Sequence, residues 1–468
     1  MNPLWTSGEI ADAVGGAAPA DFSASGVTFD SREVEPGHLF IALKGEATDG
    51  HRFLDKAFAA GAAGALVAEE IDRPHVRVGD TFAALNDLGR ASRARSGATI
   101  CGVTGSAGKT GTKEALFAAL DRAAPGQAHR SVKSYNNHTG VPLSLSRMPR
   151  EARFGVFEMG MNHAGELAAL TRLVRPQVAI VTAIASAHRE FFATEEDIAD
   201  AKGEIFQGLE EGGTAIVPFD SPHRERLMAA ARPHAARIVT FGFGEGADIR
   251  ARDVVAKTNG GSLVTAVLPE AELTFTISQA GEHWVSNALA VLGAVQAMGG
   301  DLAAAGLALA DMPGLKGRGE RHRVAVGGGE ALLIDESYNA NPSSMAATLK
   351  TFARVSASGR RIAVLGAMKE LGTTSQAFHA GLAVPIREAR VDYAILVGEE
   401  MAPLAKALGQ QVKMAHVPDT ASAVGLVRDE VRAGDAILVK GSNSIGLAAL
   451  VEALAGGPSA PLGTGKSR

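Results

Sequence analysis

The run Thr104-Gly105-Ser106-Ala107-Gly108-Lys109-Thr110 combines residue types that bind phosphate groups. Glycines let backbone N–H groups approach phosphate oxygens, and a lysine at the start of a helix adds positive charge. Lys109 is the candidate contact to the β and γ phosphates, and the Thr110 hydroxyl is the candidate ligand of Mg²⁺. The run therefore predicts a nucleoside triphosphate site, without indicating which reaction takes place there.

The spacing of this loop is shorter than the usual G-x-x-x-x-G-K-[ST], because Val103 stands where the first glycine would be. The alternative interpretation is an ordinary turn that carries a solvated lysine. The flanking residues favour a phosphate loop, since an apolar run at 100–103 precedes it and a helical pattern at 112–122 follows it.

Glu158 and His188 each come directly after an apolar run, at 154–157 and 178–187. The carboxyl ends of parallel strands meet at one edge of a sheet, so both side chains could reach a metal ion bound at the phosphate loop. For each residue taken alone, an exposed loop position is the competing interpretation.

Lys202 lies on the apolar face of a predicted helix at 194–210, between Ile198 and Ile205 at helical spacing. Thr194 is the expected N-cap, because three acidic residues follow it. A lysine on such a face either extends its amine to solvent or is buried, and burial lowers its pKa. A neutral buried amine can react with CO₂ to form a carbamate, which is an oxygen ligand for a metal ion.

The elements that must position these residues alternate between strand and helix, which predicts a parallel sheet covered by helices. The expected strands are 99–103, 154–157, 178–183 and 214–218, and the expected helices are 112–122, 163–173 and 194–210. Two further strands at 237–242 and 263–268 are expected to be antiparallel. The alternation resumes with strands at 332–334, 362–365, 394–397 and 436–439, each followed by polar or glycine-rich residues typical of a ligand-binding edge.

The chain of 468 residues has room for about three domains. A polar, arginine-containing stretch at 90–97 and a stretch rich in proline and glycine at 311–319 mark the expected junctions. We therefore predict an α/β protein with domains at 1–97, 98–315 and 316–468.

Composition excludes several classes of function. Lys and Arg number 46 against 51 Asp and Glu, so the chain has no basic excess for binding nucleic acid or anionic membranes. One cysteine, Cys101, excludes an intramolecular disulfide and a cysteine-based zinc site. The sequence shows no targeting segment and no apolar stretch of about 18 residues, so we expect a cytoplasmic protein without membrane insertion.

Together these motifs resemble the Mur ligases, the ATP-dependent amide-bond-forming enzymes of bacterial cell-wall precursor synthesis. The short G-x-x-G-K-[ST] loop is that family's own form. The matching segments span nearly the whole chain in the family's order, namely Asp30-Ser31-Arg32, Asp49-Gly50-His51, the phosphate loop, Asn136-Asn137, Gly140-Val141-Pro142-Leu143, Glu158-Met159-Gly160-Met161-Asn162, His188, Ala201-Lys202-Gly203-Glu204-Ile205, Asn287-Ala288-Leu289, Gly317-Arg318, Asp335-Glu336-Ser337-Tyr338-Asn339-Ala340-Asn341-Pro342 and Lys440-Gly441-Ser442.

The resemblance implies a central phosphate-loop ATPase domain between an N-terminal α/β domain for the UDP end of the substrate and a C-terminal Rossmann-like domain. It implies ATP and two Mg²⁺ as cofactors, with Glu158 and His188 as metal ligands and a carbamylated Lys202 beside the second ion. It further implies that Asn287 contacts the adenine, that Asp335 holds the ribose, and that Arg318 meets the phosphates at a hinge. Lys109, Glu158, His188, Lys202 and Arg318 are thus the expected catalytic residues.

The segment 338–342 is similar to the members that add D-alanyl-D-alanine to UDP-N-acetylmuramoyl-tripeptide through an acyl phosphate. Such a protein is expected to act as a monomer. The residues expected to contact the substrates are Ser31, Arg32, Asn136, Asn137, Asn339 and Asn341.

Two departures from the family's pattern concern the C-terminal block: Ala367 stands where many members carry an aspartate, and 443–446 is less basic than expected. The remaining alternatives are a member that adds the third residue, a folylpolyglutamate-type synthetase, and a non-catalytic nucleotide-binding module. The combination of Glu158, His188 and Lys202 argues against the last of these.

Overall fold

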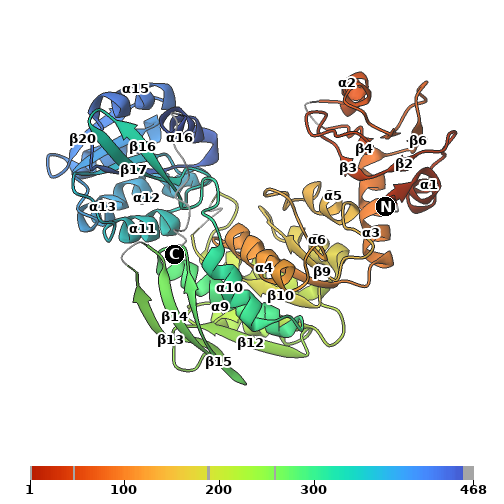
Figure 1. Cartoon of the computed structure of the whole chain (residues 1–468), viewed down its shortest axis with the longest axis horizontal. Coiled ribbons are helices and arrows are strands. Elements are labelled where there is room, and N and C mark those ends of the chain that lie inside the picture. Colours follow the sequence, from red (N-terminus) through yellow and green to blue (C-terminus); the bar gives the residue numbers. More distant parts are fainter. Residues whose placement is uncertain (1–2, 46–47, 187–189, 258–259, 457–468) are drawn as a thin grey trace, which may run out of the picture.

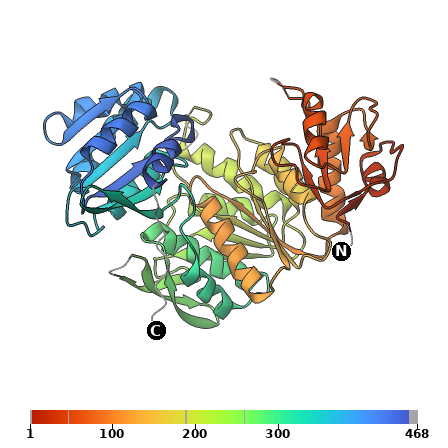
Figure 2. The ribbon, with the colours of Figure 1, turned by 45° about the horizontal axis from the view of Figure 1, so that its top comes forward.

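A computed structural model describes residues 3–45, 48–186, 190–257 and 260–456 of the chain. Figure 1 shows three successive parts of the chain, each with its own sheet or sheets: an N-terminal part, a central part and a C-terminal part. The N-terminal and C-terminal parts lie at opposite ends of the central part, and the second view agrees (Figure 2). The central part therefore contacts both of the others.

The central part contains a sheet in the order β15-β14-β13-β12-β11-β10-β7-β9-β8. Strands β7 to β13 all run parallel to one another. The pairs β13–β14 and β14–β15 are antiparallel. Their bounds are β7 (Thr99–Thr104), β8 (Ala128–Arg130), β9 (Phe154–Glu158), β10 (Val178–Val181), β11 (Thr214–Pro218), β12 (Arg237–Gly242), β13 (Ile249–Ala256), β14 (Ser262–Leu268) and β15 (Ala271–Ile277).

Helices cover both faces of this sheet, which is why its parallel strands are apolar without interruption. Cys101 and Val103 of β7 belong to the core beneath one set of helices, and Ile100 belongs to the core on the opposite face. The first face carries α4 (Lys109–Ala123), α9 (Glu282–Ala297) and α10 (Leu302–Asp311), and the second carries α5 (Gly140–Ser146), α6 (Glu166–Val174), α7 (Glu195–Gly203), the 3-10 helix η2 (Glu204–Gly208) and α8 (Arg224–Ala231).

The N-terminal part combines a two-stranded antiparallel sheet with a four-stranded parallel sheet, ordered β3-β4-β5-β6. Helix α3 extends from it toward the central part, where Leu143 joins its core. Its elements are β1 (Trp5–Thr6), α1 (Ser7–Val14), β2 (Ser23–Ala24), β3 (Gly26–Thr28), β4 (His38–Ile41), η1 (Gly50–Phe53), α2 (Leu54–Ala59), β5 (Gly64–Val67), β6 (His75–Arg77) and α3 (Thr81–Arg95).

The C-terminal part is a six-stranded sheet in the order β16-β17-β21-β18-β19-β20, in which only the β16–β17 pair is antiparallel. Its strands are β16 (Glu320–Val326), β17 (Gly329–Glu336), β18 (Arg361–Gly366), β19 (Tyr393–Val397), β20 (Lys413–Val417) and β21 (Ala436–Lys440). Two cores lie on its faces, beneath α11 (Pro342–Phe352), α12 (Ser375–Gly381), α13 (Ala383–Glu388) and α14 (Ala402–Leu408) on one and α15 (Thr420–Glu430) and α16 (Ala448–Ala455) on the other. Short 3-10 helices are η3 (Gly372–Thr374), η4 (Glu399–Met401) and η5 (Asn443–Ile445).

The predicted parallel α/β architecture is confirmed, with one correction. β12 pairs parallel with β11 and β13, so the expectation of an antiparallel strand at 237–242 is wrong, whereas β14 is antiparallel as expected. The apolar pattern of a strand does not encode its direction. Helix α8 connects β11 to β12 as a crossover, which makes the two strands parallel. The predicted domain boundaries stay predictions. Among the described residues, no helix is long and apolar enough to cross a membrane.

Candidate active site between the central and C-terminal parts

A cavity of 780 Å³ opens between the phosphate-loop edge of the central sheet and the C-terminal part. The structure brings most of the predicted site residues to its walls. These are Ser106, Ala107, Gly108, Lys109, Thr110, Asn136, Glu158, Asn287, Arg318, Asn339 and Asn341. Since they come from both parts, the cavity forms only when the two parts face each other.

The predicted phosphate loop connects β7 to α4, which begins at Lys109. The first N–H groups of a helix have no partner within the helix and are available to an anion. Lys109 Nζ donates a hydrogen bond to the carbonyl oxygen of Gly105 at 2.6 Å, so its side chain folds back over the loop. Burial lowers the pKa of Lys109, and the Arg318 cation adds to this, while Glu158 opposes it.

Position 108 requires a glycine, both because of its backbone conformation and because of a close neighbouring side chain. Its φ is +85°, and a Cβ at this position would lie 2.6 Å from Asn287 Oδ1. We expect Gly108→Ala to weaken binding of a non-hydrolysable ATP analogue by about 10-fold or more, because the loop must shift away from α9.

Gly126→Ala is the matched control for this variant. Gly126 has a φ of +73° but no heavy atom within 4 Å of the Cβ position. Both substitutions introduce the same backbone strain, of about 1–2 kcal/mol, and only Gly108→Ala should affect nucleotide binding measured by calorimetry. Equal nucleotide affinity in the two variants would contradict this account of the loop.

Glu158 lies beside the phosphate loop because β9 is the neighbour of β7, with Glu158 opposite Val103 in the register. Its Oε2 accepts a hydrogen bond from Thr110 Oγ1 at 2.8 Å, and its Oε1 accepts one from Asn136 Nδ2 at 2.8 Å. The side chain is buried. The pairing of a buried carboxylate with the loop hydroxyl excludes the competing interpretation of an exposed loop residue.

Lys113 is a residue of this site that sequence reasoning missed. Its Nζ is fully buried, donates to the carbonyl oxygens of Ser131 and Lys133 at 2.9 and 2.7 Å, and lies 3.9 Å from Glu158 Oε2. The feature of the sequence that could have identified Lys113 is its position one helical turn after Lys109. Lys113 thus links α4 to the segment that carries Asn136.

Lys202 is fully buried in α7, and its Nζ has no hydrogen-bond partner among the described residues. The alternative of an amine extended to solvent is therefore wrong. Burial lowers the pKa of Lys202 well below its usual value, and the nearby Lys109 cation contributes.

The predicted cap of α7 is confirmed, because Thr194 and Asp197 exchange side-chain to backbone hydrogen bonds of 2.9 and 3.1 Å. The predicted ligand His188 lies outside the described residues.

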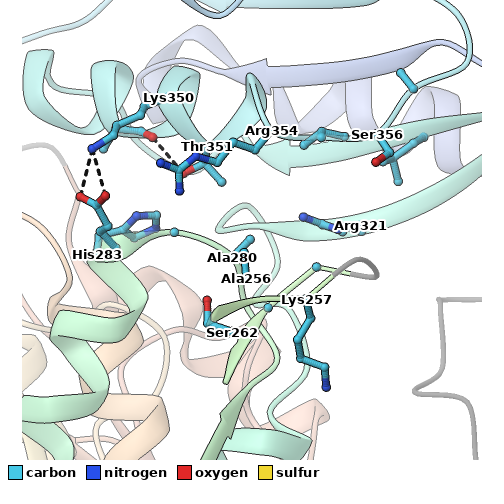
Figure 3. A pocket seen from close by; sticks show the side chains of 18 of the residues that line it. Ala256, Lys257, Ser262, Ala280, His283, Arg321, Lys350, Thr351, Arg354 and Ser356 are labelled. Atoms are coloured by element: carbon cyan, nitrogen blue, oxygen red, sulfur yellow. Dashed lines mark hydrogen bonds and ion pairs between the residues drawn. The ribbon is translucent and has the colours of Figure 1, made fainter. Parts of the chain in front are cut away.

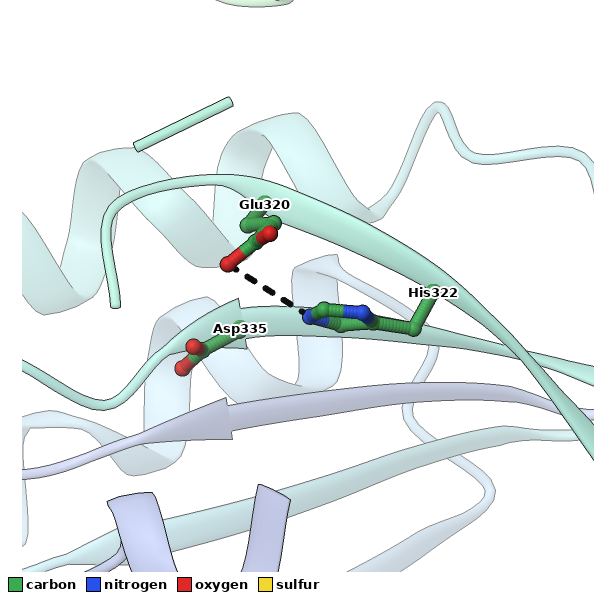
Figure 4. A group of neighbouring side chains, drawn as sticks. All are labelled: Glu320, His322 and Asp335. Carbon is green, nitrogen blue, oxygen red and sulfur yellow. Dashed lines mark ion pairs between the residues drawn. The ribbon is translucent and has the colours of Figure 1, made fainter. Parts of the chain in front are cut away.

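Asp335 is placed differently from the other predicted nucleotide contacts. Its two carboxylate oxygens accept the backbone N–H groups of Gly317 and Ser337, at 2.9 and 3.0 Å, and it is not among the residues that line the cavity. Figure 4 shows Asp335 beside Glu320 and His322. Each of the three side chains has an oxygen or nitrogen atom that could bind a metal ion, and these atoms lie within 4.8 Å of one another. Glu320 is opposite Asp335 in the β16–β17 register, which produces this grouping. Asp335 thus positions the backbone at Gly317, and its contact with ribose stays a prediction.

Arg318 follows Gly317 and stacks on Tyr338, with its guanidinium carbon 4.1 Å from the ring centroid. Asn341 caps α11 and also contacts the phosphate loop, with Nδ2 3.5 Å from the carbonyl oxygen of Ser106. Lys440 Nζ donates to the carbonyl oxygen of Asn339 at 3.0 Å, and burial lowers its pKa. The contact between Asn341 and Ser106 joins the C-terminal wall of the cavity to the phosphate loop, and the other two contacts lie within that wall.

Comparisons with known proteins assign this architecture to a family. The model of the Mur ligase middle domain matches residues 103–295, that of the glutamate ligase domain of Mur ligases matches 317–443, and that of the Mur ligase family catalytic domain matches 23–91. A protein of Escherichia coli named UDP-N-acetylmuramoyl-tripeptide–D-alanyl-D-alanine ligase is 34% identical, over 93% of this chain and 94% of that protein. The chain belongs to the Mur ligase family.

Solved structures agree with this Mur ligase over almost its whole length. A structure of MurF from Acinetobacter baumannii has a TM-score of 0.83 at 30% identity and covers 97% of this chain and 99% of that one. The MurF ligase of Thermotoga maritima, solved in complex with ADP, has a TM-score of 0.75 at 27% identity, covering 92% and 97%. The arrangement of all three parts is thus that of solved Mur ligases.

The N-terminal part of this Mur ligase holds the predicted residues Ser31 and Arg32 away from the cavity. Arg32 Nη2 and Nε pair with Asp30 at 2.6 and 2.9 Å, and this hydrogen bonding holds the pKa of Asp30 at about 2. Asn137 Oδ1 accepts the N–H of Gly140, the first residue of α5, at 2.9 Å. Their roles as substrate contacts stay predictions.

Glu33 is a second residue that sequence reasoning missed. Its Oε1 accepts a hydrogen bond from Tyr135 Oη at 2.9 Å, and Lys133 also pairs with it. Tyr135 and Lys133 flank the segment that leads to Asn136. Glu33 therefore connects the N-terminal part to the residues that hold Glu158.

Proposed function

We propose that this Mur ligase uses ATP to join D-alanyl-D-alanine to UDP-N-acetylmuramoyl-tripeptide in peptidoglycan precursor synthesis. The observation that carries the proposal is the cavity in which the phosphate loop and Glu158 face Arg318 and Lys440 of the C-terminal part. The substrates are those in the name of the E. coli relative. Nucleotide binding is supported by the ADP in the T. maritima structure.

The chemistry explains why the site has this composition. A carboxylate is a poor electrophile, so its oxygen first attacks the γ phosphorus of ATP, ADP leaves, and an acyl phosphate forms. The dipeptide amine then attacks the acyl carbon, loses a proton, and phosphate departs. Lys109 and the N–H groups at the start of α4 would stabilise the negative charge of the transferring phosphoryl group. Closure of the C-terminal part would exclude water, which hydrolyses an acyl phosphate.

The residues present fit magnesium. Thr110 and Glu158 offer adjacent oxygen atoms beside the phosphate loop, and oxygen is the ligand that Mg²⁺ prefers. We propose that these residues, with His188, hold the first of two ions. When bound, Mg²⁺ would neutralise phosphate charge.

A carbamylated Lys202 completes the proposed metal site. The neutral amine attacks the carbon of CO₂, an N–C bond forms, and one proton is released to solvent. The buried Nζ without a partner and its lowered pKa support this reaction. The resulting carboxylate would supply oxygen ligands near Lys109, where the second Mg²⁺ is proposed.

The remaining assignments follow the family. Asn287 is proposed to contact adenine and Asp335 the ribose, while Arg318 meets the phosphates. Ser31 and Arg32 are proposed to bind the UDP end. We also propose a monomeric enzyme in the cytoplasm, where ATP is available.

The deciding experiment follows phosphate release from ATP and Mg²⁺ with UDP-N-acetylmuramoyl-tripeptide, with and without D-alanyl-D-alanine. We expect phosphate only with the dipeptide, together with a product heavier by one dipeptide minus water. Turnover with the dipeptide precursor and a diamino acid instead would identify a third-residue-adding enzyme. Turnover with a folate and glutamate would identify a folylpolyglutamate-type synthetase, and ATP binding without any turnover would indicate a binding module.

A further inference from the structure

A second cavity, of 1180 Å³, lies between the central and C-terminal parts and is separate from the site described above. Its central walls are the described residues between β13 and β14, which are Lys257, Gly260 and Gly261, together with the start of α9, and its C-terminal walls come from β16 and α11 (Figure 3). It shares only His283 and Ala347 with the lining of the catalytic cavity. The second cavity, called here the rear cleft, therefore spans the same junction away from the phosphate loop.

The carboxylates that line the rear cleft already have cationic partners. Each one forms an ion pair with a lysine or arginine: Glu282 with Lys350 at 3.0 Å, Glu330 with Arg323 at 2.9 Å, and Asp435 with Arg360 at 2.8 Å. Their negative charges are thus largely compensated.

Three cations of the rear cleft, Lys257, Arg321 and Arg354, form no ion pair with a carboxylate of the described residues. Lys257 comes from the central part, and the two arginines come from the C-terminal part. Figure 3 shows Arg321 and Arg354 on the C-terminal side of the cleft, whereas the Lys257 side chain extends away from them. Once the paired groups are set aside, the uncompensated charge of the rear cleft is positive, and such a cleft attracts anions.

Arg321 extends across the junction. A Cβ on Gly260, in the β13–β14 turn, would lie 2.6 Å from Arg321 Nη1, so the guanidinium rests directly on this turn. Arg321 is partly buried, and burial lowers its pKa without any compensating acidic group. A partly desolvated guanidinium without a counter-charge is costly, and an anion would remove that cost.

We propose that the rear cleft binds a small phosphate-bearing anion through Arg321 and Arg354. Guanidinium groups match phosphate oxygens with two parallel hydrogen bonds, which favours phosphate over a simple halide. Serine hydroxyls at Ser262 and Ser356 and apolar walls at Val285 and Val355 provide room and contacts for a larger organic group. Both arginines come from the C-terminal part, whereas Ser262 comes from the central wall, so an anion that contacts all three links the two parts and stabilises their present orientation. This inference does not depend on the proposed ligase activity.

The test measures binding of inorganic pyrophosphate to the full chain by calorimetry at low salt. The Lys109→Met background removes the main lysine contact of the phosphate loop. We expect one remaining binding site in this background. Adding Arg321→Gln and Arg354→Gln should weaken pyrophosphate binding by about 10-fold or more, since two charge-assisted contacts are lost.

Arg323→Gln is the matched control, because Arg323 lines the same cleft but is paired with Glu330. It should leave pyrophosphate affinity within about 2-fold. Hydrogen exchange gives a second readout: pyrophosphate should protect the amides of β13 and β14 in wild-type protein and not in the double arginine variant. Loss of all binding in Lys109→Met, or equal affinity and equal protection with and without the two arginines, would overturn the proposal.

Discussion

Replacing Lys109 by alanine is expected to lower ATP-dependent ligation by about 10³-fold or more. Lys109 is the cation that lies over the phosphate loop, with Nζ 2.6 Å from the Gly105 carbonyl oxygen, and no other lysine belongs to that loop. In the transition state it would face a phosphoryl group whose negative charge is spread over three oxygens. The measurement is phosphate release under saturating substrates, with nucleotide binding followed separately.

A Lys109→Met variant and a melting temperature distinguish loss of charge from loss of fold. Methionine keeps much of the side-chain length and volume, so Lys109→Met should remain folded and be as inactive as Lys109→Ala. Lys350→Ala serves as a control on an exposed lysine of α11, because surface ion pairs such as its pair with Glu282 contribute at most about 1 kcal/mol. Near-normal turnover in Lys109→Met would refute the role assigned to this residue.

Replacing Lys202 by alanine is expected to abolish activity, and short carboxylic acids such as formate or acetate should restore part of it. The substitution leaves space where a fully buried amine lies, and a small carboxylate in that space would supply the oxygens that the carbamate is proposed to provide. Phosphate release, with and without added acid, measures both effects. Independently of turnover, ¹³CO₂ should give a carbamate carbon signal in wild-type protein by NMR that Lys202→Ala lacks.

Lys113→Ala is the matched control, because Lys113 is equally buried in the same part of the chain. Its Nζ donates hydrogen bonds to two carbonyl oxygens, and a carboxylate cannot replace a donor. Carboxylic acids should therefore not rescue this variant. Full activity of Lys202→Ala, or a wild-type spectrum without any carbamate signal, would rule out the carbamate proposal.

The local parts of the site were predictable because they depend on neighbouring residues. Apolar runs followed by glycines located the strands and the phosphate loop, and Thr194 with Asp197 located the start of α7. Helical spacing placed Lys202 on the apolar face, where the structure buries it. The sequence identified Glu158 as a candidate only from its position at the end of a strand. Its hydrogen bond with Thr110 forms because β9, which carries Glu158, lies beside β7, which leads into the phosphate loop, and the sequence does not show this pairing.

For several predicted substrate and nucleotide contacts, the structure shows local hydrogen bonds that the sequence analysis did not predict. Asn137 accepts the first N–H of a helix, Arg32 pairs with its near neighbour Asp30, and Asp335 accepts the backbone N–H groups of Gly317 and Ser337. Asparagine, arginine and aspartate serve such local roles as readily as they bind substrates, and a motif does not distinguish the two. Lys113 and Glu33 were missed for the opposite reason, since their partners are distant in sequence.

The sequence by itself determined the alternation of strands and helices, the phosphate loop, the family, and the apolar environment of Lys202. These follow from residue type and short-range spacing, which act within one element. Only the tertiary structure decided that β9 lies beside β7, that β12 runs parallel to β13, and that Arg321 meets the turn at Gly260. Such contacts depend on the order of strands and on the packing of separate parts, and the free energy that selects them comes from burial between residues far apart in the chain.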